Sequence, residues 1–191
     1  MYLVTTSRHA TPPVRRLARE IAWSLGLAVR VNRGRMSFEE VVELARSRNA
    51  ERVIIVWRGL HGNPGAVLIV DAAEGTISAL ALVLRGVVFA GLKARPPLPE
   101  VKPPVVSLGA EDELAEELAL ALNTVYLGAH TVEDIRSFST YRRVVALEPV
   151  KRRDFIAVVK FLDRGEELGP KLLVKHVKKG GAGLVQRMHR G

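Results

Sequence analysis

The residues best suited to chemistry in this sequence are three arginines, Arg30, Arg33 and Arg35, which lie close together in the chain. No acidic residue lies between Arg30 and Met36 to neutralise them. They come just before a predicted helix start, where free N–H groups and the helix macrodipole also favour anions. A phosphate group is therefore the ligand that this stretch suggests. The alternative is a solvated basic turn that only reverses the chain.

A strand, a turn and a helix must hold these arginines in place. Residues 28–31 alternate in a way that is typical of the end of a short strand. Gly34 can adopt a positive φ angle within the turn that follows. Ser37 and Glu40 have the spacing of a capping box, which predicts a helix over residues 38–48.

The net charge of the chain is +9, and it is unevenly distributed. Residues 1–60 carry eleven arginines and five acids (+6), and residues 61–135 carry four basic residues and ten acids (−6). Residues 136–191 carry fourteen basic residues and five acids (+9). Two basic ends around an acidic middle favour a polyanionic partner, with nucleic acid first and an anionic membrane surface a distant second. The alternative is a basic protein with no such partner.

Known catalytic and metal-binding motifs are missing from the sequence. There is no cysteine, so thiolate, disulfide and cysteine-metal chemistry are excluded. The five histidines lack metal-ligand spacing, and no lysine follows a phosphate-loop glycine pattern. The glycine-rich run over residues 61–65 fits either a close approach to a phosphate or, more simply, a hairpin connection. We therefore expect no enzyme activity, no metal and no cofactor.

The first half of the chain, residues 1–93, has the element order β-α-β-α-β-β-β. Its predicted strands and helices cover residues 2–5, 12–25, 28–31, 38–48, 52–57, 66–71 and 77–88. On the first helix, Arg15 and Arg19 are spaced i, i+4 and repel each other unless an anion lies between them. Arg16 can pair with Glu20 at the same spacing.

The second half, residues 105–178, has the same element order as the first. Five of the ten prolines fall in residues 94–104, which predicts a linker. Helices follow over residues 111–123 and 131–138, with strands over 105–108, 126–127, 142–147, 155–162 and 172–177. We therefore predict an α/β fold of two similar halves, each a mixed sheet with helices, produced by internal duplication. Residues 179–191 are basic and glycine-rich, which predicts a mobile tail.

RNA fits the charge pattern better than a specific DNA site, because no helix-turn-helix or zinc finger is visible. Tyr141 beside two arginines is the candidate for stacking on a base, although a strand-edge tyrosine explains it equally well. No apolar run reaches the length of a membrane span and no leader is visible, so we expect a cytoplasmic protein without a membrane partner. The candidate RNA-binding residues are Arg30, Asn32, Arg33, Gly34, Arg35, Arg8, Arg15, Arg19, Arg142 and Arg143.

Four motifs in order resemble the Brix domain family of ribosome-biogenesis proteins. They are Thr-Thr-Ser-Arg at residues 5–8, Arg-Val-Asn-Arg-Gly-Arg-Met-Ser at 30–37, Arg-Val-Ile-Ile-Val at 52–56 and Gly-Asn-Pro-Gly at 62–65. The resemblance covers nearly the whole chain as a single domain of the compact archaeal type. One departure is the loop over residues 57–61, where a more lysine-rich sequence is expected, and this leaves an RNA role for that loop in doubt.

The resemblance implies two α/β halves, each similar to the anticodon-binding domain of class II aminoacyl-tRNA synthetases. It also implies ribosomal RNA binding during rRNA processing and subunit assembly, without catalysis, and assigns the RNA contact to Arg30, Asn32, Arg33, Gly34 and Arg35. A different function remains open: a scaffold that docks a ribosomal or assembly-factor protein, with incidental RNA binding. In that case the acidic stretch over residues 111–117 or an exposed sheet edge would be the docking surface.

Overall fold

The chain runs twice through the same order of strands and helices. The computed structural model describes residues 1–73, 78–110, 112–150 and 153–190. The N-terminal half consists of β1 (Tyr2–Thr6), α1 (Pro12–Leu25), β2 (Ala28–Arg30), α2 (Phe38–Ser47), β3 (Arg52–Arg58), the 3-10 turn η1 (Leu60–Gly62), β4 (Pro64–Asp71) and β5 (Ala79–Val88). The C-terminal half consists of β6 (Val105–Leu108), α3 (Glu113–Leu122), β7 (Tyr126–His130), α4 (Val132–Arg136), β8 (Arg143–Pro149), β9 (Ala157–Asp163), β10 (Glu166–Glu167), β11 (Lys171–Gly180) and α5 (Ala182–Arg190).

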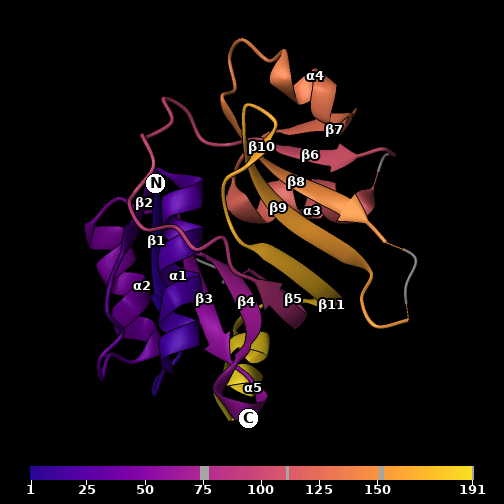
Figure 1. The fold of residues 1–191 in the computed structure, drawn as a ribbon. Coiled ribbons are helices and arrows are strands. Elements are labelled where there is room, and N and C mark those ends of the chain that lie inside the picture. The colour runs from indigo at the N-terminus through magenta and orange to yellow at the C-terminus, as the bar shows by residue number, and fades with distance from the viewer. Residues whose placement is uncertain (74–77, 111, 151–152, 191) are drawn as a thin grey trace.

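Across the described residues the strands form one 11-stranded sheet, in the order β2-β1-β3-β4-β5-β11-β9-β8-β6-β7, with β10 beside β9. In each half the first strand pairs in parallel with the next two, β1 with β2 and β3, and β6 with β7 and β8. The other neighbours are antiparallel, and β5 and β11 join the two halves, which lie side by side (Figure 1). The predicted mixed α/β class is therefore confirmed. Internal duplication as the origin of the repeated pairing stays a prediction.

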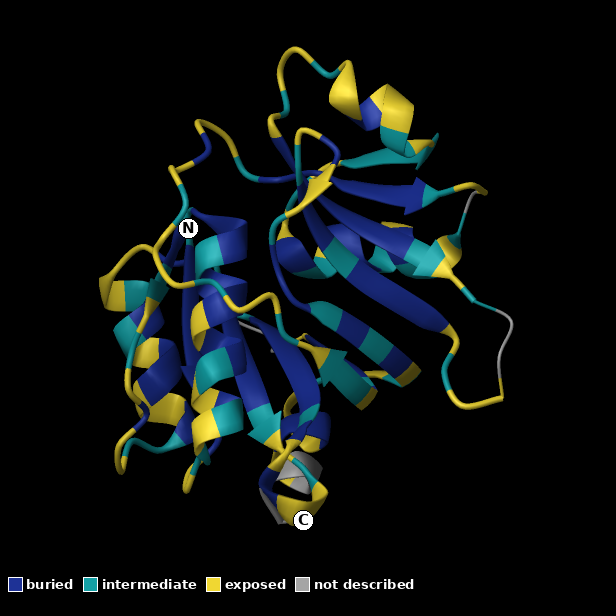
Figure 2. Cartoon of the chain, in the orientation of Figure 1, coloured by how far each residue is buried: buried dark blue, intermediate teal, exposed yellow. Residues whose placement is uncertain are grey.

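Helices cover the sheet on both faces, which explains the continuous apolar run of β3. Ile54 belongs to the buried cluster that contains α1, whereas the next residue, Ile55, belongs to the cluster that contains α2. A strand buried on both faces needs apolar side chains at successive positions. The cluster around α1 also includes Leu118 of α3 and side chains of β8 and β9. One core thus joins the two halves, and most residues of β1, β3, β4, β8 and β9 are buried (Figure 2).

The helix predicted over residues 12–25 is confirmed as α1. Its apolar residues Val14, Leu17, Ile21 and Leu25 form a stripe along one face, and all four are buried. Residues 89–104 join the halves without a helix or strand and include the predicted proline-rich linker. Residues 77, 111 and 191, which fall within the predicted strand, helix and tail, lie outside the described residues. No helix in the described part of the chain combines the length and apolarity needed to cross a membrane.

The prediction of a mobile tail over residues 179–191 is wrong for the described part of that segment. β11 continues to Gly180, which pairs with Ala79 of β5, and α5 follows. Leu184 and Val185 of α5 are buried in the cluster that contains α2. Burying such a side chain contributes roughly 1.5–3 kcal/mol. In the sequence, Leu184 and Val185 lie among glycines and cationic residues, so the segment shows no clear helical pattern.

Candidate nucleic-acid interface

The arginine-rich loop lies between β2 and α2, as the sequence predicts. Its end is fixed by a capping box: the Ser37 hydroxyl accepts a bond of 3.1 Å from the Glu40 N–H, and the Glu40 carboxylate accepts one of 2.5 Å from the Ser37 N–H. Gly34 has a φ of +53°, the left-handed region in which glycine is favoured. The cap and the turn therefore set the direction in which the loop presents its arginines.

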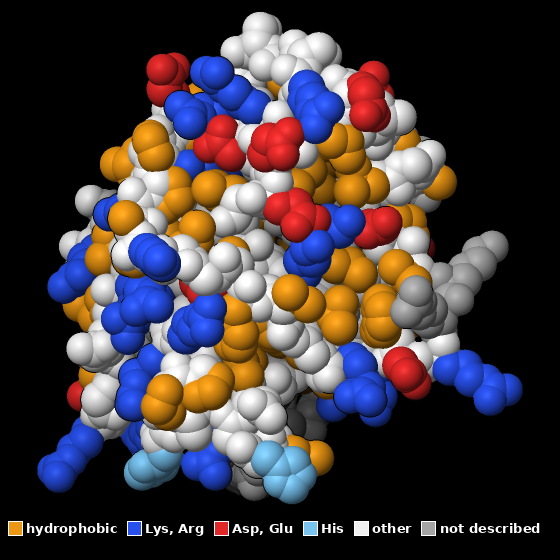
Figure 3. Space-filling view, in the orientation of Figure 1, with side chains coloured by type: hydrophobic (Ala, Val, Ile, Leu, Met, Phe, Trp, Pro, Cys, Tyr) orange, Lys and Arg blue, Asp and Glu red, His pale blue; other side chains and the backbone are white. Residues whose placement is uncertain are grey.

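Two adjoining hollows on the N-terminal half share Arg15 and Arg30, and we call them together the basic groove. The first hollow, about 430 Å³, is lined by Thr6, Ser7, His9, Ala10, Arg15, Arg30, Asn32, Arg33 and Gly34. The second, about 550 Å³, is lined by Pro12, Pro13, Arg15, Arg16, Arg19, Arg30 and Phe89. None of these described lining residues is acidic. Lys and Arg side chains gather over α1 on this side of the molecule (Figure 3).

Three exposed arginines, Arg15, Arg19 and Arg30, meet in the groove, and no carboxylate is among its described lining residues. Partial burial lowers the pKa of Arg30, and the nearby charges of Arg19 and Arg15 lower it further. Two of the three donate to neutral groups: Arg30 to the Asn32 side-chain oxygen at 3.1 Å, and Arg15 to the Ala10 carbonyl at 2.9 Å. A bound anion would relieve this mutual repulsion, as the i, i+4 spacing of Arg15 and Arg19 suggests.

Arg33 differs from its neighbours because its side chain is buried, with only 3% of the residue exposed. Its Nε donates to the Met36 carbonyl at 2.8 Å, and the Nε of Arg8 approaches the same oxygen at 3.4 Å. Both Nη atoms of Arg33 are buried, and within the described residues neither has a hydrogen-bond partner. Burial lowers the pKa of Arg33 and Arg8 lowers it further, whereas Glu39 and Glu40 raise it. Arg33 therefore forms a wall of the groove, and its role as an RNA contact stays a prediction.

A buried carboxylate positions one further arginine of the groove. Glu20 is fully buried on α1, and its Oε1 accepts a bond of 2.9 Å from the Nε of Arg16. Its Oε2 accepts a bond of 2.9 Å from the Ala90 N–H, which follows Phe89. The Arg16 guanidinium carbon lies over the Phe89 ring, 4.4 Å from the centroid. A buried charge is stable only when it is paired and hydrogen-bonded, as Glu20 is here.

The second-half candidates do not belong to this groove. Arg142 is exposed and paired with Asp163, with Nε–O distances of 2.8 and 3.1 Å. Arg143 is buried, with 2% exposed, so its assignment as an RNA contact is wrong. It donates to the carbonyls of Trp23, Ser24 and Pro97 and pairs with Asp163. Since those carbonyls belong to the end of α1 and to the linker, Arg143 ties the two halves together. Tyr141 packs, partly buried, against the cluster that contains α4.

The other candidates lie at or beside the groove, with Arg8, Arg15, Arg19, Arg30, Asn32, Gly34 and Arg35 all exposed. Sequence reasoning missed Phe89 and the role of Glu20. The i, i+4 spacing of Arg16 and Glu20 was the only signal for the latter, and it did not reveal that Glu20 is buried. Phe89 had no local signal, because it reaches α1 from the end of a distant strand.

The glycine-rich run over residues 61–65 forms the plain hairpin connection, in which η1 links the antiparallel strands β3 and β4. Gly59 and Gly65 approach backbone to backbone, and a Cβ on either would lie 2.7 Å or less from the other's Cα. No group of His, Asp and Glu side chains in the described part of the chain could hold a metal ion.

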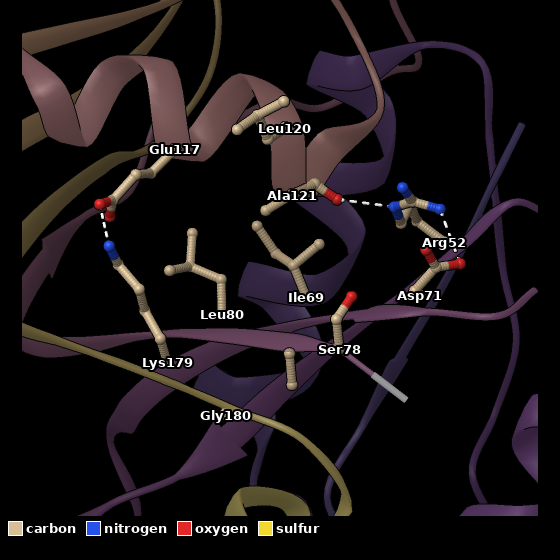
Figure 4. A pocket seen from close by; sticks show the side chains of 11 residues that line it. Arg52, Ile69, Asp71, Ser78, Leu80, Glu117, Leu120, Ala121, Lys179 and Gly180 are labelled. Atoms are coloured by element: carbon tan, nitrogen blue, oxygen red, sulfur yellow. Dashed lines mark hydrogen bonds and ion pairs between the residues drawn. The ribbon is translucent and has the colours of Figure 1, made fainter. Parts of the chain in front are cut away.

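A third hollow, about 340 Å³, lies between α3 and the strands β4, β5 and β11 (Figure 4). Ile69, Leu80 and Leu120 give it an apolar lining. Its charged groups are paired: Arg52 with Asp71 at 2.8 Å, and Lys179 with Glu117. This hollow therefore lacks the unbalanced positive charge of the basic groove.

Comparisons with known proteins show that this chain is similar to ribosomal biogenesis proteins. No protein-family model matches the sequence. A probable Brix domain-containing ribosomal biogenesis protein of Aeropyrum pernix is 30% identical over 86 residues, which is 44% of this chain and 47% of that protein. The aligned part thus spans about half of the relative.

Two solved structures share the fold. A probable ribosomal biogenesis protein from Aeropyrum pernix has a TM-score of 0.68 and 24% identity, covering 90% of this chain and 93% of its own. Mil, an archaeal Imp4-like protein, has a TM-score of 0.62 and 22% identity, covering 94% of this chain and 100% of its own. The resemblance of this chain to the Brix domain ribosome-biogenesis proteins, which its motifs predict, is thereby confirmed.

Proposed function

We propose that this protein is a non-catalytic ribosome-biogenesis factor that binds ribosomal RNA through the basic groove during rRNA processing and subunit assembly. The observation that carries the proposal is the meeting of Arg15, Arg19, Arg30 and Arg33 in hollows whose described lining contains no acid. Guanidinium groups suit phosphate because their planar N–H forks match its oxygens. The similar proteins are named as ribosomal biogenesis proteins, which supports the proposed role in ribosome biogenesis.

The proposal extends to the organisation of the chain. We treat residues 1–191 as one Brix-like domain of the compact archaeal type, located in the cytoplasm. The repeated order and pairing of β1–β5 and β6–β11 support an origin by internal duplication. From the Brix resemblance we further propose that each half is similar to the anticodon-binding domain of class II synthetases.

The test is binding to ribosomal RNA fragments across a salt series. We expect the variant R15Q/R19Q/R30Q to lose affinity and its log–log salt slope to flatten by about two to three units, because up to three phosphate contacts are removed. These three residues are exposed, so folding is expected to be unchanged. The matched control is R48Q/R85Q/R153Q, which removes the same charge from exposed arginines outside the groove. Equal losses in both variants, or a wild-type affinity independent of salt, would overturn the proposal.

A second candidate function is the docking of a ribosomal or assembly-factor protein, and the third hollow is the observation that favours it. Leu120 is 69% exposed beside an apolar hollow, and Glu113 and Glu116 are exposed on the same helix. Acidic groups around an apolar anchor site suit a basic protein segment. This function predicts a stoichiometric complex with a ribosomal protein that survives nuclease treatment and is lost in the variant L120E. Loss of the complex on nuclease treatment would count against it.

A further inference from the structure

The second hollow of the basic groove contains an aromatic ring as well as cations. Phe89 and Arg16 both line it, together with Arg15, Arg19 and Arg30. At about 550 Å³ it falls within the roughly 300–1,000 Å³ of small-ligand sites. A site for phosphate alone needs only cations or N–H donors. Phosphate binding therefore does not explain why the ring of Phe89 lines this hollow.

Arg16 is held over that ring more firmly than a surface arginine normally is. Its Nε bonds to Glu20, a carboxylate with no exposed surface, and its guanidinium carbon lies 4.4 Å from the centroid of Phe89. Glu20 also accepts from the Ala90 N–H, so one carboxylate fixes both Arg16 and the backbone beside Phe89. The side chain of Arg16 nevertheless remains 42% exposed. The groove thus presents a fixed cationic plane backed by an aromatic ring.

Guanidinium planes and aromatic rings are the surfaces on which proteins stack unpaired bases. In a duplex both faces of a base are already covered by its neighbours, so only an unpaired base can offer a face. We infer that the groove takes single-stranded RNA and stacks one unpaired base on the platform formed by Arg16 and Phe89. This inference rests on the proposed function and adds that the basic groove prefers single-stranded RNA to a duplex.

The cations around the platform suit the backbone of such a strand. Arg15, Arg19 and Arg30 surround the hollow in which the base would lie, so the phosphates flanking that base meet them. The adjoining hollow, which shares Arg15 and Arg30, then takes the next phosphate at Arg33. Both Nη atoms of Arg33 are buried without a hydrogen-bond partner among the described residues, so Arg33 attracts that phosphate by its charge from the wall of the hollow. Thr6, Ser7 and Asn32 offer polar side chains in the same hollow.

The experiment compares a short single-stranded RNA with a duplex of the same length, both with 2-aminopurine at a central position. Wild type is expected to bind the single strand about tenfold more tightly than the duplex and to quench its fluorescence, as stacking does. The variants F89L and R16K are each expected to bind the single strand about tenfold more weakly, with loss of quenching. Their salt slopes stay unchanged, because no charge is removed.

The control variants are W23L, whose ring pairs with Arg19 at 5.3 Å but does not line the groove, and R48K, which replaces an exposed arginine outside the groove. They should leave the preference for single strands and the quenching intact. R16K replaces a partly exposed residue, so it tests the platform even if F89L, which is partly buried, unfolds.

The outcomes separate this inference from the proposed function. If duplex and single strand bind equally well, or if R16K and F89L bind the single strand as wild type does, the platform is overturned. A loss of affinity confined to R15Q/R19Q/R30Q would then still support RNA binding through the groove. If wild type binds no RNA in any form, the proposed function fails and the platform fails with it.

Discussion

The two halves of this protein repeat one topology but carry opposite charge on equivalent elements. α1 in the N-terminal half and α3 in the C-terminal half both follow the first strand and pack in the same core. The exposed face of α1 carries arginines such as Arg15 and Arg19, whereas that of α3 carries Glu113 and Glu116. The shared strand order and core thus do not require the same outer face on the two helices. Under the proposed function, this difference in charge gives the two halves different roles.

The two halves also differ in the loop that follows their second strand, β2 or β7. α2 and α4 both begin with a capping box, formed by Ser37 with Glu40 and by Thr131 with Asp134. In the N-terminal half residues 31–37 separate β2 from α2 and contain Arg33 and Arg35, whereas in the C-terminal half only Thr131 separates β7 from α4. The capping box thus starts the helix in both halves. Only the N-terminal half has the longer loop, which provides the wall of the basic groove.

The largest expected effect concerns the two neighbouring arginines of the C-terminal half. R143M should lower the free energy of unfolding by about 3–5 kcal/mol, because it leaves Asp163 and three carbonyls of the junction without a buried partner. R142M should lower it by less than about 1 kcal/mol, since Arg142 is an exposed partner of Asp163. Urea unfolding of both variants measures the difference. Similar values for the two would contradict the role of Arg143 as a tie between the halves.

A smaller effect is expected from removing either capping box. S37A and T131A should each lower the free energy of unfolding by about 1 kcal/mol, because each leaves a helix N-terminal N–H without its side-chain acceptor. Only S37A should also weaken RNA binding, since Ser37 ends the arginine-rich loop. Thermal unfolding combined with RNA titration of both variants checks this. Equal RNA affinities in the two variants would remove the functional distinction between the halves.

The smallest effect is expected at Glu51, which joins the halves from the start of β3. Hydrogen bonds from Lys102 of the linker, from the Met1 amino group and from Asn123 at the end of α3 lower its pKa to about 2 from an ordinary 4.5, against the opposing effect of burial. A lowered folded-state pKa gives stability that is present above pH 4.5 and is lost as the pH falls from 4.5 towards 2. Because the side chain is 40% exposed, we expect this contribution to be less than about 1 kcal/mol.

The variant E51Q isolates this contribution. Its free energy of unfolding should fall less steeply than that of wild type as the pH is lowered from about 5 to 2, because the amide does not titrate. Denaturant unfolding at a series of pH values measures both slopes. Parallel slopes would mean that the Glu51 contacts do not stabilise the folded state.

Local signals predicted most of the elements of this fold. The stripe of α1, the apolar run of β3 and the Ser37–Glu40 capping box each depend on residues a few positions apart, so a window of sequence contains the relevant interactions. The helix α5 escaped prediction because two apolar residues in a basic segment are a weak signal until a core receives them. For the site, the i, i+4 spacing of Arg15 and Arg19 predicts an anion between two like charges that otherwise repel each other, and this stays a prediction.

The sequence by itself determined the element order up to the last helix except for the short β10, the mixed α/β class and the concentration of arginine in the N-terminal half, since these follow from periodicity, capping and composition. Only the tertiary structure decided which arginines face solvent. Arg142 and Arg143 are adjacent and identical in type, yet one is exposed and the other is buried against α1 and the linker. The tertiary structure also placed Arg16 over the ring of Phe89 and buried Glu20, which bonds to Arg16. Burial and pairing of these groups depend on contacts between residues far apart in the chain, which no local pattern encodes.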